Sequence, residues 1–182
     1  MTRTADSDLV ARMVALAHHP ATATEMGDVS GDVALPPLTP AVIDRVETEL
    51  GFPLPRLLRQ LYLQVGNGGF GPAYGLMALT GVPNPAYEVL GQFRSTRSVV
   101  PTWPSRLLPI CHQGSGTLFC LDATVPDDPP VVRYAPGLDE QETREMMGPG
   151  PVIGPGLVLE HPSFRAWLMA WVDRTEARVR SA

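Results

Sequence analysis

The segment from Ile43 to Leu79 constrains the fold most, because it predicts two short helices, a glycine-rich turn and a strand. Apolar residues recur at helical spacing over Val42–Leu50, and Gly51 follows where helices commonly end in the left-handed conformation. A second apolar stripe spans Leu54–Val65, and the glycines after it favour a tight turn with positive φ. We therefore expect a helix pair packed on a sheet. Its predicted buried residues are Val46, Leu50, Leu57, Leu58 and Leu61.

Apolar and β-branched runs predict further strands, and two amphipathic stretches predict terminal helices. The predicted strands are Leu76–Leu79, Leu107–Cys111, Thr117–Leu121 and Val131–Tyr134. The predicted terminal helices are Asp6–His18, with Asp6 or Ser7 as the N-cap, and Pro162–Arg178. Helices, then strands, then a helix indicate the α+β class, with an antiparallel meander whose helices pack mainly on one face.

Two segments give weaker signals. Ala86–Phe93 fits either a helix or a strand, and the residues themselves do not decide between them. Gly137–Gly156 is rich in glycine and proline, so we expect irregular structure with one helical turn at Glu140–Met147.

Composition limits the class of protein. A chain of 182 residues fits one domain and buries enough surface to fold without a metal or a disulfide. The net charge of −5 argues against a general nucleic-acid binder, whose surface would be basic. The sequence shows no signal peptide and no apolar run of the roughly 18 residues that a membrane helix needs. We expect a cytoplasmic protein that does not bind membranes.

The order of several short motifs resembles the SUKH superfamily, known from the Smi/Knr fungal cell-wall regulators. The first set is Glu47, Leu50-Gly51, Leu54-Pro55, the leucine-rich helix Leu57–Leu63, Asn67-Gly68-Gly69 and Gly75-Leu76. The motifs WPSRLLPI, GSGTLFCLD, PPVVRY and SFRAWL then follow from Trp103 to Leu168 in the order typical of that family. The resemblance covers roughly Leu35–Arg174. We therefore expect residues 1–34 to form an N-terminal helix and linker, and residues 35–178 to form one SUKH-like domain.

This resemblance implies a binding module without catalysis. Bacterial members of the superfamily are typically immunity proteins, encoded beside the toxins that they bind and block, and those toxins are often nucleases. The fungal members suggest an alternative, a regulatory scaffold protein. Neither role implies a cofactor, and the oligomeric state stays open.

Acidic residues are the candidate contacts for a basic protein partner, such as a toxin domain, because they would steer its association. The alternative is that they are only solvated loop residues. The candidates are Asp122, Asp127, Asp128, Glu140, Glu142 and Glu145.

An enzyme is the competing class, and a small hydrolase using Cys111 or His112 is its best form. Adjacent residues on a strand face opposite ways, so these two side chains should not pair. The spacing of Cys111 and Cys120 is not that of a zinc knuckle, although the two could be cross-strand neighbours. We expect two buried, reduced thiols and no catalytic, cofactor-binding or metal site.

Overall fold

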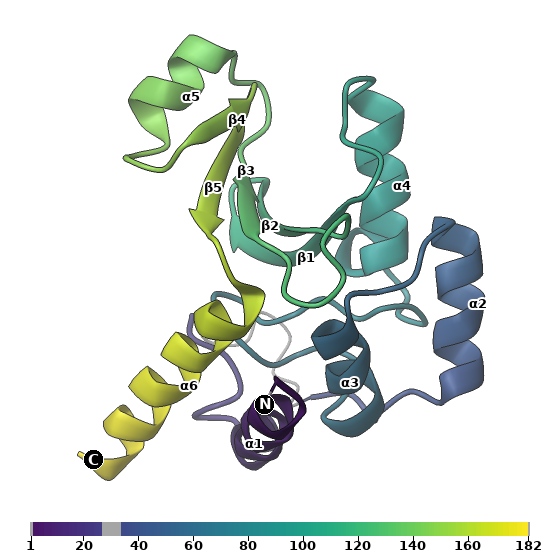
Figure 1. The fold of residues 1–182 in the computed structure, drawn as a ribbon, viewed down its shortest axis with the longest axis vertical. Coiled ribbons are helices and arrows are strands. Elements are labelled where there is room, and N and C mark those ends of the chain that lie inside the picture. The colour runs from purple at the N-terminus through teal and green to yellow at the C-terminus, as the bar shows by residue number, and fades with distance from the viewer. Residues whose placement is uncertain (1, 27–33, 182) are drawn as a thin grey trace.

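The computed structural model describes residues 2–26 and 34–181. Within these residues the chain forms six α-helices, one 3-10 helix and five strands (Figure 1). The helices are α1 (Thr2–Ala17), α2 (Pro40–Leu50), α3 (Arg56–Gln64), η1 (Pro85–Tyr87), α4 (Val89–Val99), α5 (Glu140–Met146) and α6 (Phe164–Arg180). The strands are β1 (Leu107–Gly114), β2 (Thr117–Asp122), β3 (Val131–Tyr134), β4 (Val152–Gly154) and β5 (Leu157–His161).

The strands form one antiparallel sheet in the order β1-β2-β3-β5-β4. The predicted α+β class and the meander of β1, β2 and β3 are confirmed. The chain then leaves the sheet to form α5 and returns with the β4–β5 hairpin, so that β4 is an edge strand.

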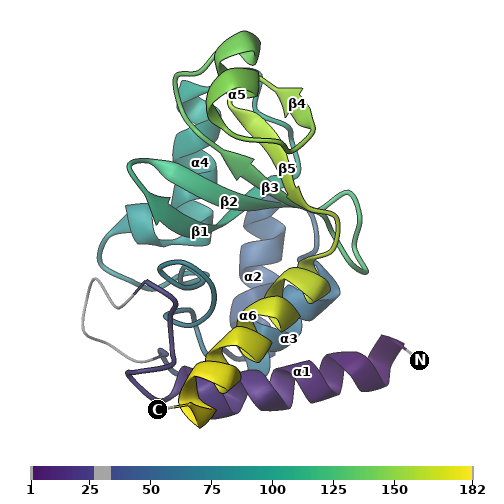
Figure 2. The ribbon, with the colours of Figure 1, turned by 90° about the vertical axis from the view of Figure 1, so that its left-hand side faces the viewer.

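The two faces of the sheet are covered unequally. One face contributes Phe119, Leu121 and Val131 to a large apolar core shared with α1, α2, α3 and α6. The other face has a smaller cluster, in which Trp103 packs edge-on against Tyr134 with ring centroids 4.8 Å apart. Most helical residues therefore gather on one side, as the sequence predicted. Figure 2 shows α6 crossing α1 at the base of the molecule, below the sheet.

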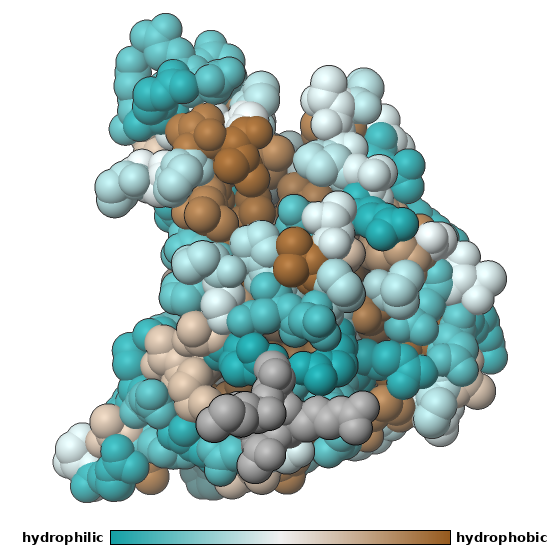
Figure 3. Space-filling model, in the orientation of Figure 1, coloured by the Kyte–Doolittle hydropathy of each residue, from teal (hydrophilic) through white to brown (hydrophobic). Residues whose placement is uncertain are grey.

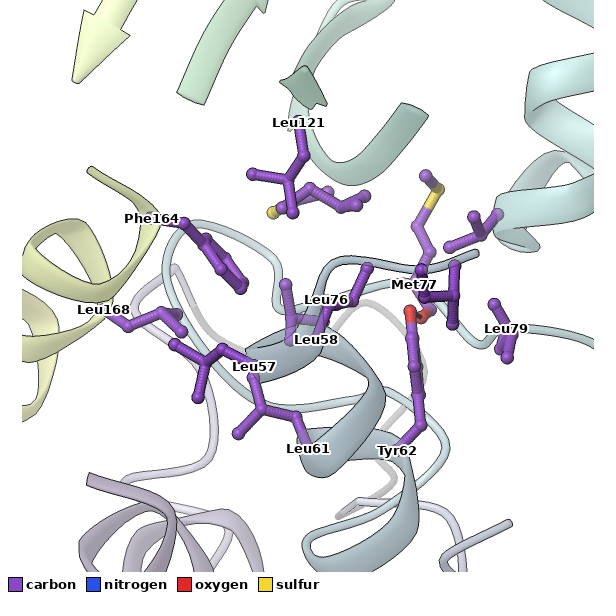
Figure 4. Close-up of a cluster of buried hydrophobic side chains, with 14 of the residues drawn as sticks. Leu57, Leu58, Leu61, Tyr62, Leu76, Met77, Leu79, Leu121, Phe164 and Leu168 are labelled. Carbon is purple, nitrogen blue, oxygen red and sulfur yellow. Dashed lines mark hydrogen bonds between the residues drawn. The ribbon is translucent and has the colours of Figure 1, made fainter. Parts of the chain in front are cut away.

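The middle of the core is built around α3 (Figure 4). Leu57, Leu58 and Leu61 of α3 are at most 1 % exposed and lie near Phe164 and Leu168 of α6, which are fully buried. Tyr62 is also fully buried, and its hydroxyl is satisfied because it donates to the carbonyl of Met77 at 2.8 Å. Burial of all five predicted helix-pair residues, Val46, Leu50, Leu57, Leu58 and Leu61, is confirmed.

Glycine is required where the chain passes from α3 to the sheet. Gly68 has a φ of +86°, and a Cβ there would lie 2.6 Å from the backbone nitrogen of Ala78. Gly66 does not adopt a positive φ, but a Cβ on it would lie 2.5 Å from the carbonyl oxygen of Leu35. Gly51, after α2, is left-handed as predicted, with a φ of +81°.

The structure corrects some predicted elements and decides one that was left open. Leu76–Leu79 makes only isolated bridges, Leu76 to Cys111 and Ala78 to Glu88, because the segment lies along the outer edge of β1 without forming a full ladder. Helix α1 begins at Thr2, so neither Asp6 nor Ser7 is its N-cap. The open segment 86–93 is helical, since η1 leads directly into α4. The helical turn predicted at 140–147 is confirmed as α5, but the rest of segment 137–156 is more regular than predicted, because it also holds β4.

No helix of the described part of the chain is long and apolar enough to cross a membrane.

Candidate partner-binding surfaces

The structure places the six predicted acidic residues in two separate regions. Asp122, Asp127 and Asp128 lie at the β2–β3 connection, close to the start of α6. Glu140, Glu142 and Glu145 lie on α5, beyond the opposite end of β3 (Figure 1). The six residues therefore do not form one continuous patch.

Asp128 is part of the fold at the start of α6. Its carboxylate accepts hydrogen bonds from the Arg165 backbone N–H at 3.0 Å and from the Ser163 hydroxyl at 2.7 Å, and it pairs with the Arg165 guanidinium at 3.1 Å. Ser163 also caps α6, because its Oγ accepts from the N–H of Ala166. These bonds satisfy donors at the helix N-terminus, so most of the Asp128 carboxylate is already used within the chain.

Asp6 completes this arrangement, which we name the Asp6 cluster: Asp6, Arg56, Asp127, Asp128 and Arg165. The Asp6 side chain is fully buried and pairs with Arg56 at 2.9 Å and Arg165 at 2.5 Å. Its hydrogen bond raises the pKa of Arg165 above the usual value. Asp127 lies 3.9 Å from Arg56, but its side chain is 83 % exposed. Among the three aspartates of the cluster, Asp127 is the one accessible to a partner.

Asp122 shapes its own loop. Its Oδ1 accepts from both the backbone N–H and the hydroxyl of Thr124, at 3.0 Å and 2.6 Å, which is the pattern of an Asx turn. The side chain therefore stabilises the turn that follows β2.

Among the residues that the structure describes, the carboxylates of α5 have only local partners. Asp139 and Glu142 form a capping box at its N-terminus, Glu140 pairs with Arg144 at 2.8 Å, and Glu145 accepts from Gln141. All of these side chains lie on the exposed side of the helix. Exposed pairs one helical turn apart contribute little to stability, so these charges remain accessible to solvent and to a partner.

Exposed apolar residues accompany them. We name residues 137–161, which hold α5, β4 and β5, the α5–β5 lobe. Met146 at the end of α5 is 71 % exposed and Ile153 on β4 is 55 % exposed. Figure 3 shows hydrophobic surface on this lobe directly beside the hydrophilic surface of α5. The sequence did not predict this surface, because residues 137–156 were expected to be irregular apart from one helical turn, and β4 was not predicted.

A concave surface, the α6 hollow, lies beside α6. It has a volume of about 340 Å³ and is bounded by Phe119, Glu160, Trp167 and the loop at Glu25. Its carboxylates are paired internally, since Glu25 lies 3.1 Å from Arg174 and Glu160 lies 3.3 Å from Arg133. The hollow therefore presents balanced charge on an aromatic base.

The residues suggested for a hydrolase are not arranged for catalysis. Cys111 is fully buried, its thiol donates to the carbonyl of Pro72, and burial raises its pKa to about 12. His112 faces elsewhere, with Nε2 2.8 Å from the carbonyl oxygen of Ala86 and its ring against Tyr87. A nucleophilic cysteine needs a lowered pKa and a base within hydrogen-bond reach, and Cys111 has neither.

The two cysteines are also separated by the sheet. Cys111 belongs to the large core and Cys120 to the cluster on the other face, because Cys111 lies opposite Phe119 in the register. Burial raises the pKa of Cys120 as well. The described residues contain no group of three or more His, Cys, Asp or Glu side chains that could hold a metal ion.

Comparison with protein families matches residues 37–169 to the SMI1 / KNR4 family (SUKH-1). The chain belongs to this family. The SUKH-1 match contains α2, α3, the whole sheet and the beginning of α6, and therefore includes both acidic regions described above. A comparison with curated proteins finds no matching sequence.

The SUKH-1 match leaves α1 outside. Leu9 and Met13 of α1 are nevertheless fully buried in the large core, and Arg12 pairs with Asp173 and Glu176 of α6 at 2.6 Å and 2.8 Å. We still propose that residues 1–34 form an N-terminal helix and linker and that residues 35–178 form the SUKH-like domain.

Proposed function

We propose that this SUKH-1 protein is a non-catalytic binding module of the immunity type, which binds a cognate toxin and blocks it in the cytoplasm. The observation that carries the proposal is membership of the SMI1 / KNR4 family over residues 37–169. The partner would be a protein with a basic surface, as a nuclease domain has. The function would need no cofactor, and no nucleic acid or membrane would be bound.

The charge of the chain supports a basic partner. The net charge is −5, and the carboxylates of α5 are exposed with only local partners. Complementary charge speeds association and discriminates against wrong partners. Of the six residues proposed as contacts, Asp127, Glu140 and Glu145 are the better candidates. Asp122 stabilises its own turn, Asp128 holds the start of α6, and Glu142 closes the capping box of α5.

The proposal is tested by co-expression. The protein encoded by the reading frame beside this gene would be produced with and without the SUKH-1 chain, and growth and complex formation would be measured. We expect growth arrest by that neighbour alone, rescue by the chain, and a stable complex of the two purified proteins. A neighbour that arrests growth and is neither bound nor neutralised by the chain would contradict the immunity role.

A regulatory scaffold of the Smi/Knr type is the second candidate, and the family match supports it equally. The two roles differ in the fate of the partner. A scaffold would leave the activity of its bound partner intact, whereas an immunity protein would abolish it in a purified assay.

A further inference from the structure

We infer that the basic partner docks on the α5–β5 lobe, with Met146 and Ile153 as apolar contacts inside an acidic rim. This inference rests on the proposed function and identifies the surface that performs it. The argument depends on exposed apolar area, on charge, and on how firmly the lobe is held.

The apolar contribution comes from two side chains that the fold leaves in solvent. Met146 is 71 % exposed and Ile153 is 55 % exposed, while their neighbours Met147 and Val158 are at most 7 % exposed. Figure 3 shows hydrophobic surface gathered over β4 and β5, beside the hydrophilic surface of α5. Exposed apolar patches with a polar rim are typical of protein interfaces, and methionine is enriched there.

The charge of the lobe determines what would cover it. Residues 137–161 contain five carboxylates and one arginine, and Arg133 of β3 pairs with Glu160, so this group carries a net charge of −3, while the whole chain carries −5. The carboxylates are Asp139, Glu140, Glu142, Glu145 and Glu160. A neutral or acidic partner would have to desolvate this charge without compensation, whereas a basic surface would complement it.

Hydrogen bonds hold the lobe in place, so its residues would lose little conformational freedom when a partner binds. The Arg133 guanidinium donates to the carbonyl of Met147, and the Gly156 N–H donates to the buried hydroxyl of Thr143. The capping box fixes the start of α5, and the N–H of Leu159 donates to the carbonyl of Pro151. A preorganised surface loses less conformational entropy when it binds.

The mode of contact is through side chains rather than strand addition. Strand β4 pairs on one side with β5 and is the edge of the sheet, but it spans only Val152–Gly154. Pro151 and Pro155 flank it and lack the N–H groups that a longer added strand would need.

The α6 hollow is less suitable for a basic partner. Its two carboxylates are already paired with Arg133 and Arg174, so it offers no excess of negative charge. An arginine of the partner would have to displace an internal arginine there.

The test uses the purified full chain and the neighbouring toxin, inactivated at its catalytic residue, in a binding titration. The double variant M146S/I153S removes the apolar contacts at exposed positions, so its thermal unfolding should match the wild type. We expect at least about 30-fold weaker binding, the scale of an interface hot spot. The matched control is V99S/V179S, which changes residues that are 73 % and 53 % exposed on α4 and α6, and it should bind within about twofold of wild type.

A charge variant tests the rim separately. E140Q/E145Q should slow association about tenfold at low salt and reduce its salt dependence, because screening weakens steering by exposed charges. If M146S/I153S bound the toxin as tightly as the wild-type chain, the docking site proposed here would be wrong, but the immunity proposal would stand. Absence of binding by the wild-type chain would overturn both.

Discussion

Carboxylates at the base of the molecule pair across elements that are distant in sequence, whereas those of α5 pair within that helix. Asp6 of α1 joins Arg56 of α3 and Arg165 of α6, and Arg12 joins Glu176 of α6. On α5, Glu140 pairs with Arg144 one turn away. Acidic residues that look equivalent in the sequence thus hold the fold together in one region and remain available to a partner in the other.

The difference follows from burial. The Asp6 side chain is fully buried, so its charge must be compensated by arginines whatever their distance in sequence. The α5 side chains are solvated, and their local pairs are weak and easily exchanged for contacts with a partner.

The largest effect expected at the base is that of Asp6→Ala. It leaves the guanidinium groups of Arg56 and Arg165 without their buried partner, which should cost about 3–5 kcal/mol of unfolding free energy. Urea denaturation would measure it. Asp8→Ala, at an exposed position of the same helix, is the control and should stay within about 0.5 kcal/mol. If the two variants were equally stable, the buried pairs of Asp6 would not hold the fold together, and the base would not differ from α5 in this respect.

Asp128→Ala should cost about 1–2 kcal/mol, since it removes acceptors at the N-terminus of α6. Its neighbour Asp127 is exposed and makes only a long contact with Arg56, so Asp127→Ala should cost less than about 0.5 kcal/mol. Chemical denaturation of the two variants compares adjacent residues of the same type. A larger loss of unfolding free energy for Asp127→Ala than for Asp128→Ala would mean that Asp127, and not Asp128, stabilises the fold.

The pair of Arg12 with Glu176 should make stability depend on pH. The hydrogen bond from Arg12 lowers the pKa of Glu176, so the stabilisation is complete above the unfolded-state value of about 4.3 and is lost as the pH falls through the lower folded value. The surface location limits the effect to about 1 kcal/mol. Denaturation from pH 6 downwards would measure it, and Glu176→Gln should remove this component of the profile.

The smallest effect is expected on α5. Glu140→Gln and Glu145→Gln should each change the unfolding free energy by less than about 0.5 kcal/mol, because their partners lie one helical turn away. Thermal melts at low and high salt would show it. A loss of unfolding free energy above about 1 kcal/mol would mean that these carboxylates stabilise the fold, as those at the base do, and are not free to bind a partner.

Local signals in the sequence predicted the local structure correctly. The apolar stripes before Gly51 and Gly66 predicted α2 and α3, and the apolar and β-branched runs predicted β1, β2 and β3. Leu76–Leu79 was predicted as a strand because it is apolar, but pairing in a sheet depends on neighbours that one strand's sequence does not contain. Strand β4 was missed because prolines flank its three residues, a composition typical of loops.

The candidate sites depended on contacts between distant residues and were therefore harder to predict. Asp127 and Asp128 are adjacent, and only the position of α6 makes one structural and the other exposed. Asp6 looked like a helix cap because aspartate is common there, whereas its partners lie 50 and 159 residues away. The family motifs indicated the fold correctly but contain no signal for the surface of the α5–β5 lobe.

Helix α1 has a practical consequence for anyone who isolates this unit. Sequence similarity would select residues 37–169 as the unit to isolate. That cut would remove Asp6, the buried partner of Arg56 and Arg165, and would expose the apolar side chains that pack against Leu9 and Met13. Such a fragment would expose hydrophobic surface and uncompensated positive charge at its base. The residues that match the family are therefore fewer than the residues that a stably folded fragment needs. Expression or grafting of the family region should keep the chain from Thr2 onwards.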